Sequence, residues 1–136
     1  MIRLSKGICE RVVAEAAEGY PYETCGLLVG YRKQGTTSVL EAVRAANINL
    51  ERRGDRYQLD PKTMHSASRR ASGLGLDIVG IWHSHPDYPA HPSEADRVAA
   101  WTGWSYVIVS VMRTGLVEIR SWRIEKGQFE EEEIAS

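Results

Sequence analysis

The chain has 136 residues, the length of one ordinary domain, and is 43% hydrophobic and 26% charged. Its formal net charge of −1 gives no electrostatic reason to expect nucleic acid or a membrane as the main partner. It has no apolar stretch of membrane-spanning length and no signal peptide, and its two cysteines exclude a disulfide framework, so we expect a cytoplasmic protein.

The first part of the chain predicts a helix followed by a β-hairpin. Ser5 is a candidate N-cap for a helix over residues 6–18, where apolar residues recur at helical spacing. Residues 25–31 form an apolar run typical of a buried strand. The turn expected at residues 33–36 then leads into a returning strand over residues 37–46.

The middle of the chain is more polar and predicts a loop, a short strand and a second helix. Residues 47–55 are typical of a loop, and residues 56–59 predict the short strand. Asp60 then stands at a cap position with Pro61 at the first helical position, and the helix is expected to end near Gly73.

The remaining elements predict a mixed sheet with helices around it. Residues 77–82 predict a central strand, and a third helix is expected from Ser93. Residues 106–112 and 116–124 predict the last two strands.

The glutamates of residues 130–133 are interpreted as a solvated face. No repeat, linker or boundary interrupts the chain. We therefore expect a single α/β domain over residues 1–136.

Two histidines at the end of the predicted central strand are the strongest functional signal. Side chains at i and i+2 of a strand point to the same face, so His83 and His85 can bind one ion together. A loop and a helical turn can return Asp96 as a third ligand. Two histidines and one carboxylate with an open fourth position are typical of a catalytic zinc site.

Each of these residues also has a simpler interpretation. His83 and His85 could be ordinary histidines at the end of a strand. Ser93 and Asp96 have the spacing of a capping box, although that motif usually has Glu or Gln in place of the aspartate. The two interpretations are compatible, because Ser93 can cap the helix while Asp96 turns toward a metal.

A hydrolytic zinc site also needs a general base. Glu23 is the candidate, because it lies at the edge of a buried strand where an acid is otherwise unfavourable. Its alternative role is that of a carboxylate in a turn. Cys25 could be a thiol nucleophile, although a buried cysteine beside a glycine is more often inert. His91 is expected near the mouth of the site, and His65 is expected to be structural.

Three motifs together resemble the JAMM (MPN+) metalloproteases, the Mov34/PAD-1 group. They are Pro-Tyr-Glu-Thr-Cys-Gly at 21–26, His-Ser-His-Pro at 83–86 and Ser-Glu-Ala-Asp at 93–96. The resemblance spans about residues 5–125 and implies a cytidine-deaminase-like α/β sandwich, a mixed sheet flanked by about three helices. It is closest to the compact prokaryotic type, since the chain is too short for the insertions of eukaryotic members.

The resemblance also implies roles for individual residues and one zinc ion per chain. The implied zinc ligands are His83, His85 and Asp96. Glu23 becomes the general acid/base, and Ser93 becomes the hydroxyl that stabilises the oxyanion. Asn47 is a candidate contact on the substrate side.

The implied reaction is hydrolysis of a peptide or isopeptide bond after the C-terminal Gly-Gly of a ubiquitin-like, sulfur-carrier protein. An extended carrier tail could pair with an edge of the sheet. Two other classes stay open: an MPN-type binding module without catalysis, and a hydrolase that uses Cys25. Homo-oligomerisation is also left open by the sequence.

Overall fold

The computed structural model describes residues 1–136 and contains three helices and eight strands. The helices are α1 (Lys6–Gly19), α2 (Pro61–Gly73) and α3 (Glu94–Ala99). The strands are β1 (Ile2–Arg3), β2 (Cys25–Lys33), β3 (Thr36–Ala45), β4 (Asp77–Pro86), β5 (Ser105–Val111), β6 (Val117–Glu125), β7 (Gln128–Glu132) and β8 (Ile134–Ala135). No helix is long and apolar enough to cross a membrane.

The helices begin at the residues whose side chains can cap them. The hydroxyl of Ser5 accepts a hydrogen bond from the amide of Ile8, which satisfies one of the free N–H groups of the first turn. The carboxylate of Asp60 likewise accepts a hydrogen bond from the amide of Lys62. Pro61 lies in the first turn of α2, where its lack of an amide hydrogen costs no helical hydrogen bond. The caps therefore confirm the predicted starts of α1 and α2.

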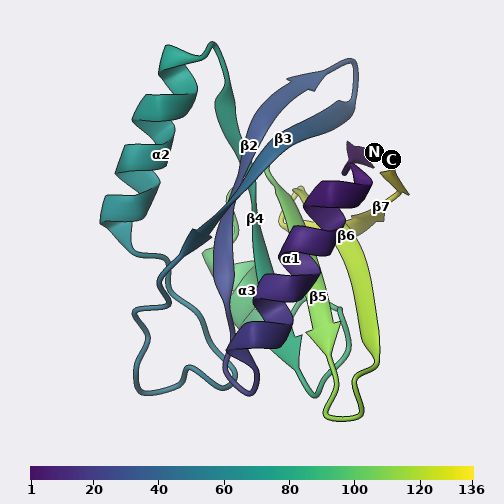
Figure 1. Cartoon of the computed structure of the whole chain (residues 1–136). Helices are drawn as coiled ribbons and strands as arrows, with labels where there is room; N and C mark the ends of the chain where they lie inside the picture. Colours follow the sequence, from purple (N-terminus) through teal and green to yellow (C-terminus); the bar gives the residue numbers. More distant parts are fainter.

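All eight strands form one mixed sheet in the order β7-β6-β5-β4-β2-β3-β1-β8. Strand β4 lies inside the sheet, antiparallel to β2 and parallel to β5. The helices pack around this sheet (Figure 1). The structure confirms the mixed α/β fold with three helices, and the cytidine-deaminase-like arrangement stays a prediction.

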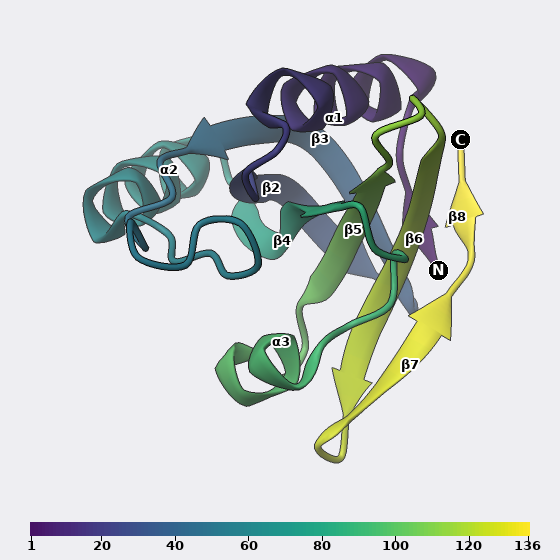
Figure 2. The same cartoon turned by 90° about the horizontal axis from the view of Figure 1, so that it is seen from below.

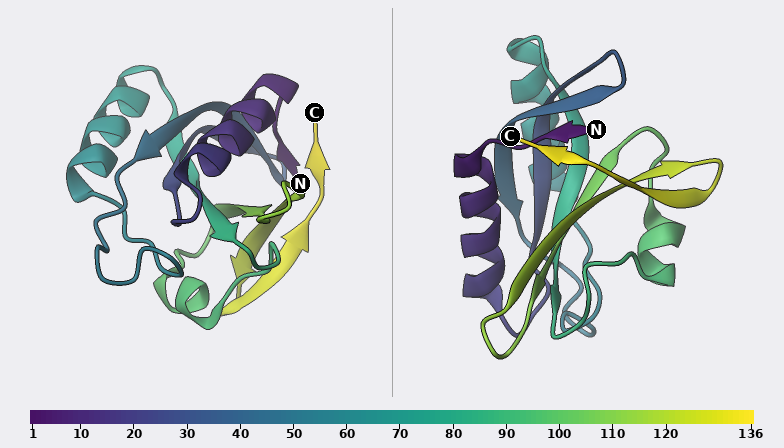
Figure 3. Two further views of the ribbon diagram at one scale, coloured as in Figure 1. Left: turned by 60° about the horizontal axis from the view of Figure 1, so that its bottom comes forward. Right: turned by 90° about the vertical axis from the view of Figure 1, so that its right-hand side faces the viewer.

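The two faces of the sheet carry separate apolar cores. On one face, Val12 and Ala16 of α1 pack in a cluster with Trp82 of β4. On the other face, Ala67 of α2 packs in a cluster with Ile81. Views along the sheet place α1 on the first side and α3 on the opposite side (Figures 2 and 3). Adjacent residues of β4 thus face different layers, as strand geometry requires.

Two predicted elements differ in the structure. The strand predicted at residues 56–59 is absent; Leu59 makes only an isolated bridge with Asn47, and the rest of that stretch is irregular. Residues 56–59 have no neighbouring strand with which they could form a continuous ladder of backbone hydrogen bonds. The central strand predicted to end at Trp82 instead continues to Pro86, because β5 pairs with it along that length.

The prediction of a solvated face in the glutamate-rich tail is correct for Glu130, Glu131 and Glu133, which are exposed, but the tail is also part of the sheet. It forms β7, which pairs with β6, and leads directly into β8, which pairs with β1 at the other edge of the sheet. Only Glu133 separates β7 from β8. The sheet must therefore curl until its edges approach each other, and the right-hand view of Figure 3 shows this tail crossing between them.

Candidate metal centre

Strand β4 presents both predicted histidines on one face. His83 and His85 follow Ile81 at alternate positions, and both are 0% exposed. His83 pairs across the sheet with Cys25 of β2 on one side and Ile108 of β5 on the other. Neither imidazole can therefore leave this position without disturbing the middle of the sheet.

The first turn of α3 brings Asp96 to the same place. Oδ2 of Asp96 lies 3.2 Å from Nε2 of His85, and Oδ1 lies 3.8 Å from Nε2 of His83. The capping box is also present: the Asp96 amide donates to the Ser93 hydroxyl, and Oδ2 of Asp96 accepts from the Ser93 amide at 2.8 Å. Capping and proximity to the histidines therefore occur together.

The hydrogen bonds of His85 fit a metal ligand. Its Nδ1 lies 2.7 Å from the carbonyl oxygen of Pro89, which can only accept, so Nδ1 must carry a proton. In neutral His85 the lone pair of Nε2 then faces a carboxylate oxygen 3.2 Å away. Two such acceptors repel each other unless His85 is protonated or a cation lies between them. A backbone carbonyl on the other ring nitrogen is also typical of metal-bound histidine.

His83 and Glu23 complete a cluster that fits a divalent cation. Both ring nitrogens of His83 are buried without a hydrogen-bond partner, which is costly in the absence of a ligand. Ligand atoms of Glu23, His83 and His85 lie within 4.8 Å of one another. Since Glu23 and Asp96 are both buried acids, a cation would also balance their charge. The residues present therefore fit a metal ion.

His83 and Asp96 shift each other's pKa values. Desolvation would raise the pKa of Asp96, but the charge of His83 and the hydrogen bond to His85 outweigh it and hold that pKa well below its usual range. Burial would likewise lower the pKa of His83, but the nearby charge of Asp96 and the proximity of Glu23 raise it overall. Without a cation, His83 and Asp96 thus favour their charged forms together. Binding of a metal ion would require His83 to be neutral, so the ion would displace that proton.

Glu23 is held just before β2 by its backbone. Its amide donates to the carbonyl of Arg53 at 2.6 Å, and its carbonyl accepts from Nδ2 of Asn47 at 3.1 Å. The side chain is buried, with Oε1 3.5 Å from Nδ1 of His83. That distance is too long for a strong hydrogen bond, so Oε1 is free to bind another group.

Two tyrosines at the site were missed by the sequence analysis. The ring of Tyr57 stacks on His83 with centroids 4.4 Å apart, and the ring of Tyr88 stacks on His85 at 4.0 Å. The Tyr88 hydroxyl also donates to Oε2 of Glu23 at 2.9 Å. Both tyrosines lie in irregular segments, where no hydrophobic period reveals which way a side chain points.

The remaining predicted residues lie near the site or away from it. Nδ2 of Asn47 donates to two backbone carbonyls, and Oδ1 accepts from two backbone amides, so the whole amide group holds the loop that passes Glu23. Its predicted contact with substrate stays a prediction. His91 is exposed and lies against Trp122, and His65 is exposed on α2.

Cys25 lies next to the site but lacks the features of a nucleophile. Its side chain is fully buried, and its thiol contacts the carbonyl oxygens of Ala45 and Ala46. Burial and the charge of Glu23 raise the pKa of the thiol to about 12. A thiol that stays protonated and inaccessible cannot attack a substrate.

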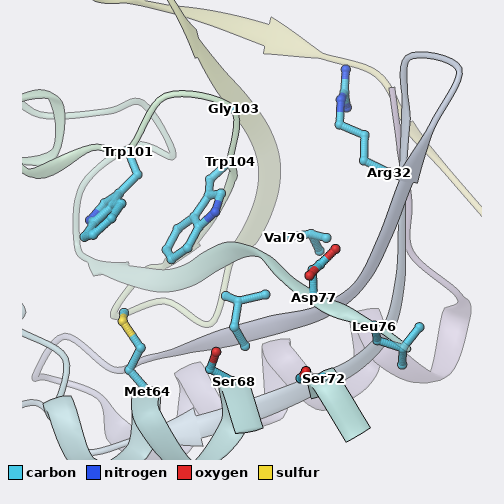
Figure 4. A pocket seen from close by; sticks show the side chains of 11 residues that line it. Arg32, Met64, Ser68, Ser72, Leu76, Asp77, Val79, Trp101, Gly103 and Trp104 are labelled. Atoms are coloured by element: carbon cyan, nitrogen blue, oxygen red, sulfur yellow. The ribbon is translucent and has the colours of Figure 1, made fainter. Parts of the chain in front are cut away.

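A large cavity of the molecule lies away from these residues. It has a volume of about 570 Å³ and is formed where α2 faces the start of β4 and the turn after α3. Trp101 and Trp104 stack on one wall, and Met64 points toward them from α2 (Figure 4). None of the predicted site residues lines it.

Comparison with known proteins matches this chain to a family of peptidases and related domains. The model of the prokaryotic homologs of the JAB domain matches residues 5–125. The chain is 35% identical over 106 residues to a desampylase from Haloferax volcanii, covering 74% of each protein. It is 32% identical over 124 residues to a CysO-cysteine peptidase from Mycobacterium tuberculosis, covering 90% of this chain and 82% of the relative.

Solved structures show the same fold. A protein from Desulfitobacterium hafniense superposes with a TM-score of 0.86 at 32% identity, covering 98% of this chain and 91% of that one. A protein from Salinibacter ruber gives a TM-score of 0.75 at 35% identity, with 99% and 90% covered. The family match covers every residue of the cluster described above. The chain therefore belongs to the prokaryotic homologs of the JAB domain.

Proposed function

We propose that this protein is a zinc-dependent peptidase or isopeptidase. The observation that carries the proposal is the convergence of His83, His85 and Asp96 in a buried cluster where both ring nitrogens of His83 lack a hydrogen-bond partner. These residues would hold the zinc ion, leaving a fourth position for water or substrate. When bound, zinc would lower the pKa of water to about 7 and polarise a carbonyl group.

The side chains around the cluster supply the proton transfers. Oε1 of Glu23 would take a proton from the attacking water and pass it to the leaving nitrogen. The buried carboxylate is suited to this exchange, because its other oxygen is already bound by Tyr88. The Ser93 hydroxyl accepts from the Asp96 amide, which leaves its own proton free to stabilise the carbonyl oxygen as negative charge develops.

The named relatives indicate the class of substrate. One is called a desampylase, another a CysO-cysteine peptidase, and a third, from Thermus thermophilus, a probable TtuB-protein conjugate cleaving protease. We infer that this chain likewise cleaves the bond after the C-terminal Gly-Gly of a ubiquitin-like, sulfur-carrier protein. The leaving group would be an amino acid, a peptide or a conjugated protein.

The fold constrains how the tail of the carrier can bind. Strand β4 is paired with β5 as far as Pro86 and with β2 as far as His83, so no free sheet edge lies beside His83. The tail must instead bind against irregular backbone near the site. The loop over residues 46–60 is suited to this, because it passes Glu23 and has few strand partners of its own.

The two alternative functions gain less support. A binding module would not need a buried histidine with two unpartnered ring nitrogens, His83, beside two buried acids. A thiol hydrolase would need an accessible Cys25 of lowered pKa, and Cys25 has neither property.

The first test is metal content. We expect about one zinc ion per chain by elemental analysis of protein purified without a histidine tag. Asp96→Ala should lose most of that zinc, whereas Glu94→Ala, an exposed change in the same helical turn, should keep it. A wild-type protein that holds no metal and takes up none on addition of zinc would contradict the proposal and favour the binding module.

A further inference from the structure

The loop after β4 places one aromatic residue against two parts of the candidate site. Tyr88 is half-buried and lies two residues after the end of β4. Its hydroxyl contacts Glu23, which lies just before the neighbouring strand β2, and its ring contacts His85. Tyr88 therefore touches a predicted proton carrier and a predicted metal ligand through separate groups.

The hydroxyl provides the one hydrogen bond that the carboxylate of Glu23 receives. It donates to Oε2 at 2.9 Å, while Oε1 remains on the side of His83. Because Glu23 is only 3% exposed, water cannot readily replace this donor. The contact thus decides which carboxylate oxygen faces the reacting groups.

The ring of Tyr88 acts on His85 from a different direction. The two rings are 4.0 Å apart between centroids and are nearly parallel, with an angle of 16°. The next residue, Pro89, accepts the hydrogen bond from Nδ1 of His85. One short segment therefore holds the imidazole both by its face and by its edge, which orients Nε2.

The backbone of this segment is itself firmly placed. Asp87 adopts a φ of 63°, a left-handed conformation that turns the chain sharply, and its carboxylate accepts from the Arg113 amide and the Tyr20 hydroxyl. The amide of Asp87 donates to the carbonyl of Val111, and the carbonyl of Tyr88 accepts from the Ser110 hydroxyl at 2.6 Å. Hydrogen bonds to β5 thus hold the Tyr88 segment in place without a substrate.

We propose that Tyr88 is a positioning residue of the reaction, whose hydroxyl orients Glu23 and whose ring orients His85. This inference rests on the proposed function, because it assigns Tyr88 a role through Glu23 and the zinc ligands. The two halves of the proposal are separable, because Tyr88→Phe removes only the hydroxyl and Tyr88→Leu removes the ring as well.

The experiment compares these two variants with the wild type and with Tyr22→Phe. Tyr22 is the matched control, since it precedes Glu23 in the chain and is exposed, and its ring lies under Arg53. Turnover is measured with a peptide ending in Gly-Gly joined to a fluorescent amine. The zinc dissociation constant is measured separately by competition with a chelator, and thermal unfolding checks that each variant folds.

The expected results separate the hydroxyl from the ring. Tyr88→Phe should lower kcat about tenfold, with KM and the zinc dissociation constant little changed, because only the orientation of Glu23 is lost. Tyr88→Leu should also raise the zinc dissociation constant by about tenfold, the lower end of what outer partners of a ligand contribute. Tyr22→Phe should match the wild type in both measurements.

Three outcomes would overturn the role of Tyr88. They are a wild-type kcat for Tyr88→Phe, a zinc affinity that falls as far in Tyr88→Phe as in Tyr88→Leu, and an unchanged zinc affinity in both. Glu23→Gln is measured beside them. If it loses turnover while Tyr88→Phe does not, only this inference fails; if it keeps full turnover, the proposed mechanism fails as well.

Discussion

The two ends of β4 differ in what they offer to a ligand. At the end of the strand, His83 and His85 are completely buried and lie against charged and aromatic side chains. At its start, residues 77–79 line the open cavity of about 570 Å³, where Trp101 is 59% exposed (Figure 4). The cavity therefore lies apart from the cluster of histidines and acids.

The comparison shows that the candidate site is better identified by converging polar groups than by volume. Hydrolysis needs ligands, a proton carrier and an oxyanion donor within a few ångströms, and only the end of β4 brings such groups together. The cavity at the start of β4 is suited to apolar contact. Substitutions at both ends can test whether function is divided in this way.

The largest effect is expected for His83→Ala. Because His83 is a predicted ligand, zinc affinity should fall by more than about 100-fold, which exceeds the usual effect of an indirect partner. Turnover should be lost with the metal. Elemental analysis and a peptide-cleavage assay measure the two effects. The control is His65→Ala, an exposed histidine on α2 that should change neither; a zinc-loaded, active His83→Ala protein would remove His83 from the site.

Glu23→Gln should separate metal binding from catalysis. The amide is nearly the same size but cannot carry the proton, so kcat should fall by about 10²–10⁴-fold while zinc is retained. Steady-state kinetics on zinc-loaded protein measure this loss. Glu18→Gln, on the exposed side of α1, provides the control. Unchanged turnover in Glu23→Gln would falsify the assignment of the general base.

Ser93→Ala should have a smaller effect on turnover, about 10²-fold, because one oxyanion donor is removed. The change also removes the cap of α3, at a cost of about 1 kcal/mol in the free energy of unfolding. Ser5→Ala, which removes the cap of α1 alone, should show the loss of stability by thermal unfolding without the loss of kcat. If both variants keep full turnover, Ser93 serves only as a cap.

At the opposite end of β4, Trp101→Ala should leave peptide turnover within about twofold of the wild type. The side chain is exposed and contacts none of the catalytic candidates, so only apolar surface is lost. The same peptide assay measures it. A loss as large as that of Ser93→Ala would mean that the two ends of the strand work together.

Alkylation should have no effect at all on activity. Because burial raises the pKa of Cys25 to about 12, its thiolate fraction near pH 8 is on the order of 10⁻⁴. Iodoacetamide should therefore leave Cys25 unmodified by mass spectrometry and the enzyme active, whereas phenanthroline should inhibit it. The opposite pattern would revive the thiol hydrolase.

The parts of the site that follow local periodicity were predictable from the sequence. His83 and His85 share a face because strand side chains alternate, and Asp96 lies where a capped helix must start. Tyr57 and Tyr88 were not predictable in this way. Their positions depend on loops that are shaped by distant hydrogen bonds, such as that from Ser110 to the Tyr88 carbonyl.

The same distinction applies to the fold. Helix caps and the β2–β3 hairpin depend on neighbouring residues, and both were predicted. The strand in the tail was missed because its charged residues are typical of a solvated surface, although Lys126 and Gly127, both with positive φ, mark a hairpin turn into β7. The pairing of β8 with β1 has no local signal at all, because its partner lies at the opposite end of the sequence.

That last pairing has a consequence for how the protein folds. Ile2 is the partner of Ile134, so the pairing of β8 with β1 links opposite ends of the chain, has a very high contact order and cannot occur until residues 134 and 135 have been synthesised. The candidate catalytic residues all lie between positions 23 and 96 and depend on β2, β4, α3 and β5, the last of which ends at Val111. During synthesis, the reactive centre can therefore assemble before β8 joins the sheet.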